Sequence, residues 1–206
     1  MTQGRRDGAG GEVGFLLIIS GPSGVGKSSL TNALLGRLDA DLSVSMTTRP
    51  ASRSDVDGEH YHFVDLPRFE AAIEAGDLLE HAVYNGNYYG TPRKYVQEKL
   101  DGGRVVILEI DVEGARQVKR AMPEAFAIFI KAPGEDALLA RLRGRQREDE
   151  QTIQKRFALA RKEIAFAEKS DVYDAFVVND DFDRAVAEIE RLVRRRLAAG
   201  AEPRLF

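Results

Sequence analysis

A glycine-rich octapeptide between an apolar run and a helical segment constrains the fold of this chain more than any other feature. The apolar run "FLLIIS" (15–20) leads directly into "GPSGVGKS" (21–28), and "KSSLTNALLGRL" (27–38) continues with a helical spacing of apolar residues. The octapeptide fits the pattern G-x-x-x-x-G-K-[ST], which requires a strand before it and a helix after it. In that setting the backbone N–H groups of the loop and the helix N-terminus surround phosphate oxygens. The motif therefore predicts that the chain binds a nucleoside triphosphate.

The residues of this phosphate loop have distinct expected roles. Lys27 is expected to reach the β- and γ-phosphates, and the hydroxyl of Ser28 is placed to ligate Mg²⁺. The residues expected to contact the triphosphate are Gly21, Pro22, Ser23, Gly24, Val25, Gly26, Lys27, Ser28 and Ser29. A purely structural glycine-rich turn is the alternative, and the matching strand and helix on either side disfavour it.

Three further apolar runs predict a parallel α/β architecture. They are "RVVILEID" (104–111), "AFAIFIKA" (125–132) and "DAFVVND" (174–180), and a segment with helical period follows each. Such runs are typical of buried parallel strands joined by helices. Residues 61–92 break the alternation with mixed strand, helix and turn signals, which predicts an inserted α+β lobe. We expect one α/β domain that carries this insertion, as 206 residues allow.

Composition argues against several classes of protein. A hydrophobic content of 43% supports a packed core, and a net charge of −3 argues against bulk nucleic-acid binding. No apolar run approaches the roughly 18 residues needed to cross a bilayer, and "MTQGRRDGAGGEVG" (1–14) lacks a signal peptide's apolar region. Cysteine is absent, which is compatible with a reducing compartment. We expect a cytoplasmic protein with a flexible tail at 1–14 and no membrane or nucleic-acid partner. Monomer and homo-oligomer stay open.

The phosphate loop alone leaves the class of nucleotide-binding protein open. A GTPase is expected to carry N-K-x-D, and "VVNDD" (177–181) lacks the lysine. "DVEG" (111–114) resembles a D-x-x-G switch only superficially, because Asp111 is equally suited to capping the helix that follows. The arginine-dense "RLRGRQREDEQTIQKRF" (141–157) has the layout of a mobile lid that neutralises a transferring phosphoryl group.

These motifs resemble those of the guanylate kinase family, which transfers phosphate from ATP to GMP. The resemblance spans 15 to about 196 and rests on "GPSGVGKSS", "SVSMTTR", "DGEHYHF", "LLEHAVYNGNYYGT", "ILEIDVEGA", "RLRGR", "KR" and "VVNDD". "SVSMTTR" and "GNYYG" in this order are specific, whereas the phosphate loop is generic. The family implies a three-layer P-loop kinase fold with a parallel sheet, ADP and GDP as products, Mg²⁺ as cofactor and dGMP as a further substrate. The implied parts are a core (15–44, 96–134, 161–200), a GMP-binding lobe (45–95) and a lid (135–160).

The resemblance also assigns residues to GMP. Guanine presents donors at N1 and the 2-amino group, so a carboxylate suits it, whereas the N1 acceptor of adenine repels a carboxylate. The implied guanine contacts are Glu80 on N1 and the 2-amino group, Asp111 and Ser45 near the 2-amino group, and Thr91 on O6. The implied phosphate contacts are Arg49, Tyr61 and Tyr89, although a lone tyrosine is by default a core aromatic.

Two departures from the family pattern concern charged residues. The family usually reads T-T-R-x-P-R-x-G-E where this chain reads "TTRPASRSD" (47–55), so the second phosphate-binding arginine falls on Ser52. We expect Arg53, one position later, to reach the same phosphate through an altered turn. Glu109 stands where the family usually has aspartate, and the retained carboxylate keeps an expected role near Mg²⁺, through water.

On the ATP side the resemblance implies four further assignments. Arg145 and Arg156 are implied as lid arginines that neutralise the transferring phosphoryl, and Arg141 and Asn179 are implied near the adenine. The expected catalytic set is Lys27, Arg49, Arg145 and Arg156.

The histidines of "HYHF" (60–63) are expected to have no part in the site. His60 and His62 alternate with Tyr61, which predicts strand residues on the face opposite that tyrosine. With no cysteine and few other metal-binding side chains nearby, we expect no metal site there.

Three alternatives are weighed against a guanylate kinase. A guanylate-kinase-like binding module typically has a degraded phosphate loop, whereas Lys27 and Ser28 are intact here. A GTPase-type switch is disfavoured by the missing N-K-x-D. A kinase for another nucleoside monophosphate is disfavoured by the pair Glu80 and Asp111.

Overall fold

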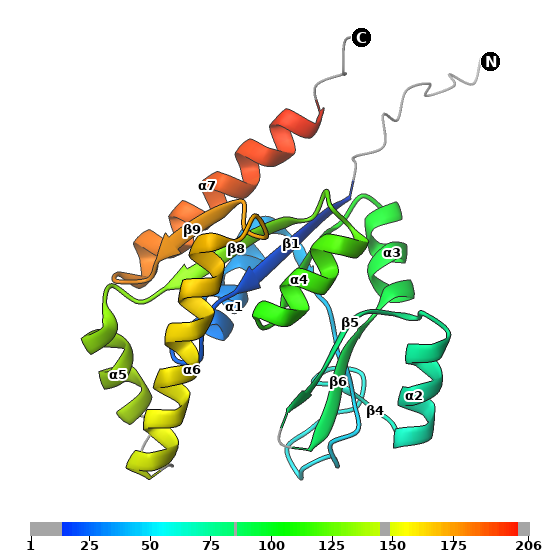
Figure 1. The fold of residues 1–206 in the computed structure, drawn as a ribbon. Coiled ribbons are helices and arrows are strands. Elements are labelled where there is room, and N and C mark those ends of the chain that lie inside the picture. Colours follow the sequence, from blue (N-terminus) through cyan, green and yellow to red (C-terminus); the bar gives the residue numbers. More distant parts are fainter. Residues whose placement is uncertain (1–13, 85, 145–148, 202–206) are drawn as a thin grey trace, which may run out of the picture.

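The fold is built around a five-stranded parallel sheet (Figure 1). The structure, a computed structural model, describes residues 14–84, 86–144 and 149–201. The strand order is β2-β7-β1-β8-β9. The bounds are Phe15–Ser20 (β1), Ala40–Leu42 (β2), Val105–Glu109 (β7), Phe126–Lys131 (β8) and Ala175–Val178 (β9). The four apolar runs are confirmed as parallel strands, and β2 is a strand that the sequence did not indicate.

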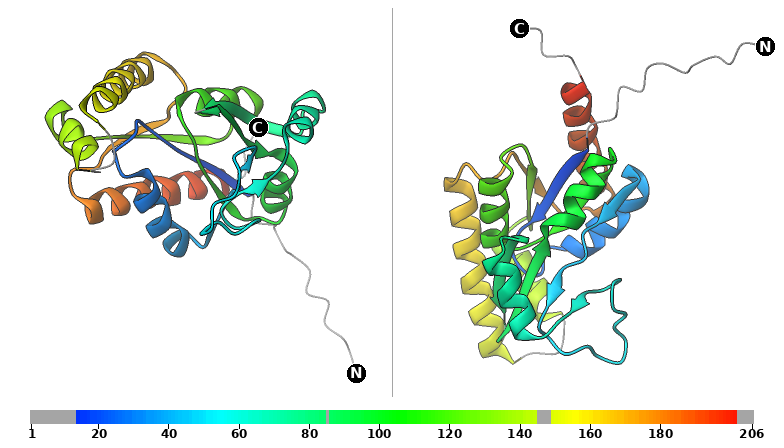
Figure 2. Two further views of the ribbon diagram at one scale, coloured as in Figure 1. Left: turned by 90° about the horizontal axis from the view of Figure 1, so that it is seen from below. Right: turned by 90° about the vertical axis from the view of Figure 1, so that its right-hand side faces the viewer.

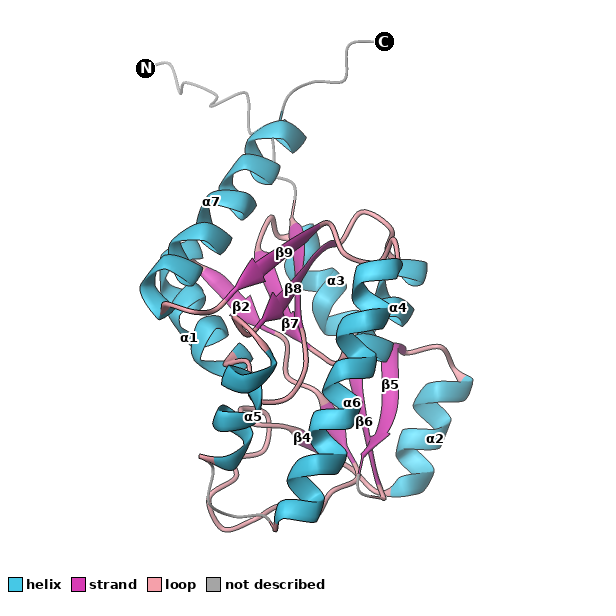
Figure 3. Cartoon of the chain, turned by 60° about the vertical axis from the view of Figure 1, so that its left-hand side comes forward, coloured by secondary structure: helices cyan, strands magenta, loops and turns pink. Residues whose placement is uncertain are grey.

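Alternate strand positions fill two cores, one on each face of this sheet. In β1, Leu17 and Ile19 belong to the first core, and Leu16 and Ile18 belong to the second. The first core is covered by α1 (Lys27–Leu38), α5 (Glu135–Arg143) and α7 (Phe182–Ala201), and the second by α3 (Arg93–Asp101) and α4 (Val112–Ala121). Figure 3 shows α1 and α7 on one side of the sheet and α3 and α4 on the other. The three-layer α/β prediction is confirmed. Within the described ranges, none of the helices has the length and apolar character needed to cross a membrane.

A second sheet of four strands forms the inserted lobe, in the order β4-β3-β6-β5. Its elements are β3 (Met46–Thr47), β4 (His62–Phe63), α2 (Leu66–Glu74), β5 (Leu78–Tyr84) and β6 (Asn87–Pro92). Helix α2 begins where the Asp65 carboxylate accepts a hydrogen bond from the backbone N–H of Arg68 (3.0 Å), and it buries Phe69 completely. Figures 1 and 2 show this lobe and the pair α5 and α6 on opposite sides of the same end of the molecule.

Helix α6 (Glu150–Lys169) connects the expected lid to both cores. Its residues Ile153 and Ala160 join the first core, and Ala167 joins the second. The helix runs without a break through residue 160, where we expected the lid to end, and α3 likewise runs through residue 95, where we expected the lobe to end. The expected lid and lobe therefore each share a helix with the core.

Candidate active site

The phosphate loop joins β1 to α1, and its lysine side chain binds back to the backbone of the loop. Lys27 Nζ donates hydrogen bonds to the carbonyl oxygens of Gly21 (2.6 Å) and Pro22 (3.2 Å). Gly26, directly before α1, has φ +91°, and a Cβ there would lie 2.7 Å from Asn179 Nδ2. Both the backbone conformation and the close approach of the amide require glycine at this position. The loop therefore has the shape that the motif predicts, with the helix N-terminus directed at it.

A serine and a carboxylate meet beside this loop. Ser28 Oγ donates a hydrogen bond of 2.6 Å to Glu109 Oε1, because β1 and β7 are neighbours with Ile19 opposite Glu109. A hydroxyl and a carboxylate are hard oxygen ligands of the kind that Mg²⁺ prefers. In the described part of the chain, no group of three or more His, Cys, Asp or Glu side chains is placed to hold a metal ion. The Ser28–Glu109 pair therefore supplies two oxygen ligands of the kind that suit Mg²⁺.

Side chains from the lid and from the end of β9 contact the loop on its other side. Arg156 Nη2 on α6 donates to Ser23 Oγ (2.8 Å). Arg141 Nη2 on α5 donates to the carbonyl of Asn179 (2.7 Å), whose own amide donates to the carbonyl of Val25 (2.8 Å). The structure thus brings Arg156 and Asn179 to the phosphate loop, and Arg141 to Asn179. Arg145 lies outside the described residues.

The expected guanine-binding residues also lie together. Glu80 on β5 is only 6% exposed, and its Oε1 accepts a hydrogen bond of 2.7 Å from Thr91 Oγ1 on β6. The pKa of Glu80 is raised to about 7, chiefly by burial; the hydrogen bond from Thr91 opposes the rise, and the negative charge of Asp111 adds to it. Asp111 Oδ1 accepts the backbone N–H of Gly114 (2.8 Å), so this aspartate caps α4 and lies beside Glu80 at once.

The expected phosphate-binding residues of GMP form a second cluster on the lobe. The guanidinium of Arg49 lies 5.3 Å from the ring centroid of Tyr61, and the rings of Tyr61 and Tyr89 are 5.8 Å apart between centroids. Arg49 Nη1 also pairs with Asp55 Oδ2 at 2.9 Å. The hydrogen bond from Arg49 and, next, that from the backbone of Ser52 lower the pKa of Asp55. Asp55 is therefore a charged partner of Arg49 that the sequence did not indicate.

The turn that carries Arg53 is shaped by its own side-chain hydrogen bonds. The backbone N–H of Ser52 donates to Asp55 Oδ2 (2.6 Å), and Ser52 Oγ and Ser54 Oγ lie 3.2 Å apart. Arg53 is exposed at the tip of this turn. Its part in phosphate binding stays a prediction.

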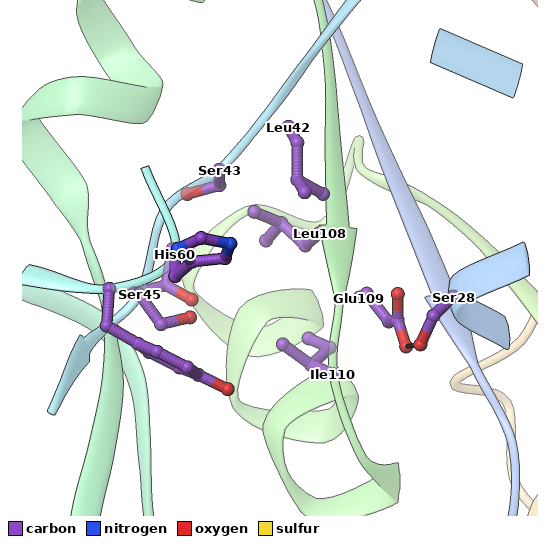
Figure 4. Close-up of a pocket in the computed structure, with 10 residues that line it drawn as sticks. Ser28, Leu42, Ser43, Ser45, His60, Leu108, Glu109 and Ile110 are labelled. Carbon is purple, nitrogen blue, oxygen red and sulfur yellow. Dashed lines mark hydrogen bonds between the residues drawn. The ribbon is translucent and has the colours of Figure 1, made fainter. Parts of the chain in front are cut away.

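A pocket of about 220 Å³ lies between the phosphate-loop helix and the lobe, and Tyr61 and Thr91 are the members of the two clusters that line it. Figure 4 shows Ser28 and Glu109 on one side of it and Ser43, Ser45 and His60 on the other. The pocket therefore connects the phosphate-loop serine to the lobe that carries the expected GMP residues.

The prediction that His60 lies on a strand, opposite Tyr61, is wrong. His60 belongs to the turn before β4, which begins at His62, so the alternation of strand side chains does not apply to it. Its Nδ1 accepts the backbone N–H of Val56 (2.9 Å), and its ring lines the same pocket as Tyr61. The alternating "HYHF" pattern gave no sign of this placement.

The fold and the site define a P-loop nucleotide phosphotransferase, in which a phosphate loop faces a second site on an inserted lobe. The sequence model of the guanylate kinase family matches residues 14–196. The chain is 46% identical over 181 residues to a guanylate kinase of Prochlorococcus marinus (strain MIT 9313), covering 87% of this chain and 94% of that protein. It is 49% identical over 181 residues to one of Chromohalobacter salexigens, covering 87% of this chain and 83% of the relative. The crystal structure of guanylate kinase from Anaplasma phagocytophilum superposes with a TM-score of 0.71 at 33% identity, covering 90% of this chain and 87% of that one. The chain belongs to the guanylate kinase family.

Proposed function

We infer that the protein transfers the γ-phosphoryl group of ATP to GMP and releases ADP and GDP. The observation that carries this inference is the buried carboxylate of Glu80, next to Asp111, on a lobe whose pocket also reaches Ser28 of the phosphate loop. A buried carboxylate is costly unless a ligand or a neighbour compensates it, and guanine supplies two donors on one edge. The family of the chain agrees with this activity.

We assign the binding of GMP to the lobe, residues 45–95. Glu80 accepts the N1 and 2-amino hydrogens, Asp111 and Ser45 lie near the 2-amino group, and Thr91 serves O6. On the phosphate, the guanidinium of Arg49 and the phenols of Tyr61 and Tyr89 donate hydrogen bonds, and Arg53 adds a second positive charge. This assignment is supported by the contacts of Arg49 with Tyr61 and of Tyr61 with Tyr89, which bring the three side chains together.

We assign ATP to the phosphate loop and the lid. Its phosphates are cradled by the loop, residues 21–29, and its adenine lies near Arg141 and Asn179. Lys27 exchanges its contacts with the loop carbonyls for the β- and γ-phosphate oxygens. Arg156, already against Ser23, together with Arg145, neutralises charge on the transferring group.

Ser28 and Glu109 would hold Mg²⁺, the first directly and the second through water. The ion supplies charge neutralisation on the phosphate oxygens of ATP. Acid–base chemistry is minimal, and the chain itself contributes positioning, charge and the exclusion of water when the lobe and the lid approach each other. A cytoplasmic location also stays a prediction.

A coupled assay of ADP release tests this function. Purified protein is supplied with ATP, Mg²⁺ and, in turn, GMP, dGMP, AMP, UMP, CMP and dTMP. We expect turnover with GMP, turnover with dGMP, and little with the others. Turnover with AMP and none with GMP would contradict the proposal.

A further inference from the structure

Gly114 lies inside helix α4, where glycine does not stabilise the helix. It is the third residue of α4 and is buried. Glycine in a helix is less favourable than alanine, because it loses more conformational freedom on folding. Gly114 is also absent from the glycines with positive φ in the described part of the chain. Neither helix stability nor backbone conformation therefore accounts for this residue.

The space beside Gly114 is filled by the two carboxylates of the guanine site. A Cβ at this position would lie 2.9 Å from Glu80 Oε2, 3.3 Å from Ile110 Cβ and 3.4 Å from Asp111 Oδ1. A carbon 2.9 Å from the Glu80 oxygen is too close, so either the carboxylate or the helix would have to move. The absence of a side chain at Gly114 therefore leaves room for both carboxylates near one point.

Neither neighbour is free to yield. Glu80 is buried, and Thr91 holds its Oε1 at 2.7 Å, which orients Oε2 toward Gly114. Helix α4 is held by Gln117, whose side-chain amide makes two hydrogen bonds with the backbone of His81. The N–H of His81 donates to Gln117 Oε1 (3.0 Å), and Gln117 Nε2 donates to the carbonyl of His81 (3.0 Å). Because His81 follows Glu80, this amide clamp fixes the register of α4 against β5 beside the carboxylate.

We propose that Gly114 and Gln117 are positioning residues for guanine. The bare Cα of Gly114 lets Glu80 Oε2 lie beside Asp111, and the amide clamp of Gln117 keeps the lobe strand and the core helix in register. Glu80 comes from the lobe and Asp111 from the core. The packing of α4 against β5 therefore sets whether the carboxylate oxygens of both residues can bind the same guanine base. This inference rests on the proposed function and adds two residues that do not themselves contact GMP.

The test separates GMP binding from folding. In Gly114→Ala we expect the KM for GMP to rise about 10- to 100-fold, since a misplacement of about 1 Å costs on that order. The kcat and the KM for ATP should stay within about twofold, and the circular dichroism spectrum should show that the variant is folded. Gln117→Ala should raise the KM for GMP in the same direction. Gly36→Ala is the matched control, because a Cβ at this helical glycine of α1 meets nothing within 4 Å and lies outside the site.

A double-mutant cycle gives the second readout, with kcat/KM measured at subsaturating GMP. With the Glu80 side chain removed in Glu80→Ala, adding Gly114→Ala should cost no further activity, because the added methyl no longer meets a carboxylate. Fully additive losses overturn the proposal, as does an unchanged KM for GMP in Gly114→Ala. If Gly114→Ala does not fold, Gln117→Ala becomes the test. An unchanged kcat/KM for GMP in Gln117→Ala would then refute the positioning role of Gln117. A wild-type protein that does not use GMP refutes the proposed function instead, whatever the variants do.

Discussion

Replacing Glu80 with glutamine is expected to stabilise the protein at neutral and alkaline pH while it impairs the use of GMP. The pKa of Glu80 rises from its ordinary value of 4.5 to about 7 in the folded protein, chiefly through burial. At 1.36 kcal/mol per pKa unit, this rise corresponds to about 3 kcal/mol of folding free energy. Because the side chain is 6% exposed, solvent screening reduces this figure little. Glutamine keeps an oxygen for Thr91 and has no charge to bury.

The sign follows from the raised pKa of Glu80. Folding favours its protonated form, so the contribution to stability is complete below about pH 4.5 and is lost as the pH rises to about 7 and above. We therefore compare the free energy of unfolding of Glu80→Gln with that of the wild type at each pH. The difference, variant minus wild type, should be about 2 to 3 kcal/mol larger at pH 8 than at pH 5. In the enzyme assay, the wild-type KM for GMP should fall as pH rises through about 7, since the ionised carboxylate accepts the guanine donors.

Urea unfolding followed by circular dichroism measures this difference, and the chain contains no tryptophan to use instead. The comparison is made at pH 5, 6, 7 and 8 for the wild type, Glu80→Gln and the control Glu70→Gln, which replaces an exposed glutamate of α2. The control should follow the wild type at every pH. A stability difference between Glu80→Gln and the wild type that does not change with pH would refute the reasoning about burial.

Three further predictions address the phosphate loop, the altered turn and the first core. Lys27→Ala should lower kcat by about 100- to 1,000-fold while the circular dichroism spectrum is kept, and retained activity would contradict the phosphate-loop assignment. Arg53→Ala should raise the KM for GMP about tenfold with kcat unchanged, as expected for one charged hydrogen bond; an unaltered KM would show that Arg53 does not replace the arginine missing at Ser52. Leu30→Ala, which empties a fully buried site on α1, should lower the free energy of unfolding by about 2 to 5 kcal/mol in urea titrations, and a loss under 1 kcal/mol would contradict its place in the core.

The three central strands of the main sheet, β7, β1 and β8, were predictable because they are buried on both faces. Runs such as "RVVILEID" (104–111) are continuous in apolar residues, and that pattern survives without any knowledge of their partners. Strand β2 escaped notice because "ADL" (40–42) is short and only partly buried, and β7 beside it supplies the pairing that defines it. The ends of the lobe and the lid were harder to place, since α3 and α6 each cross an expected boundary without any local signal.

In the site, sequence motifs identified the candidate functional residues, but they did not show which other residues these side chains contact. Ser28 and Glu109 are 81 positions apart and meet only because β1 and β7 pair, which the strand order decides. The turn from 50 to 61 was the least predictable part, because its side-chain hydrogen bonds set the backbone course. In that turn Asp55 takes Arg49 as its partner and His60 enters the pocket, and neither contact leaves a periodic pattern in the sequence.

The continuity of α6 has a consequence for exchanging parts between relatives. One helix of 20 residues, about 30 Å long, carries Arg156 against the phosphate loop and Ala167 in the second core. A chimera that joins a foreign lid at residue 160 would cut this helix in mid-turn and pair unmatched faces with both cores. The natural cassette instead runs from the cap of α5 at Gly134 to the cap of α6 at Ser170, where both joints fall in non-helical backbone. Lid transplants in this family should therefore tolerate junctions at these caps and fail at junctions inside the helix.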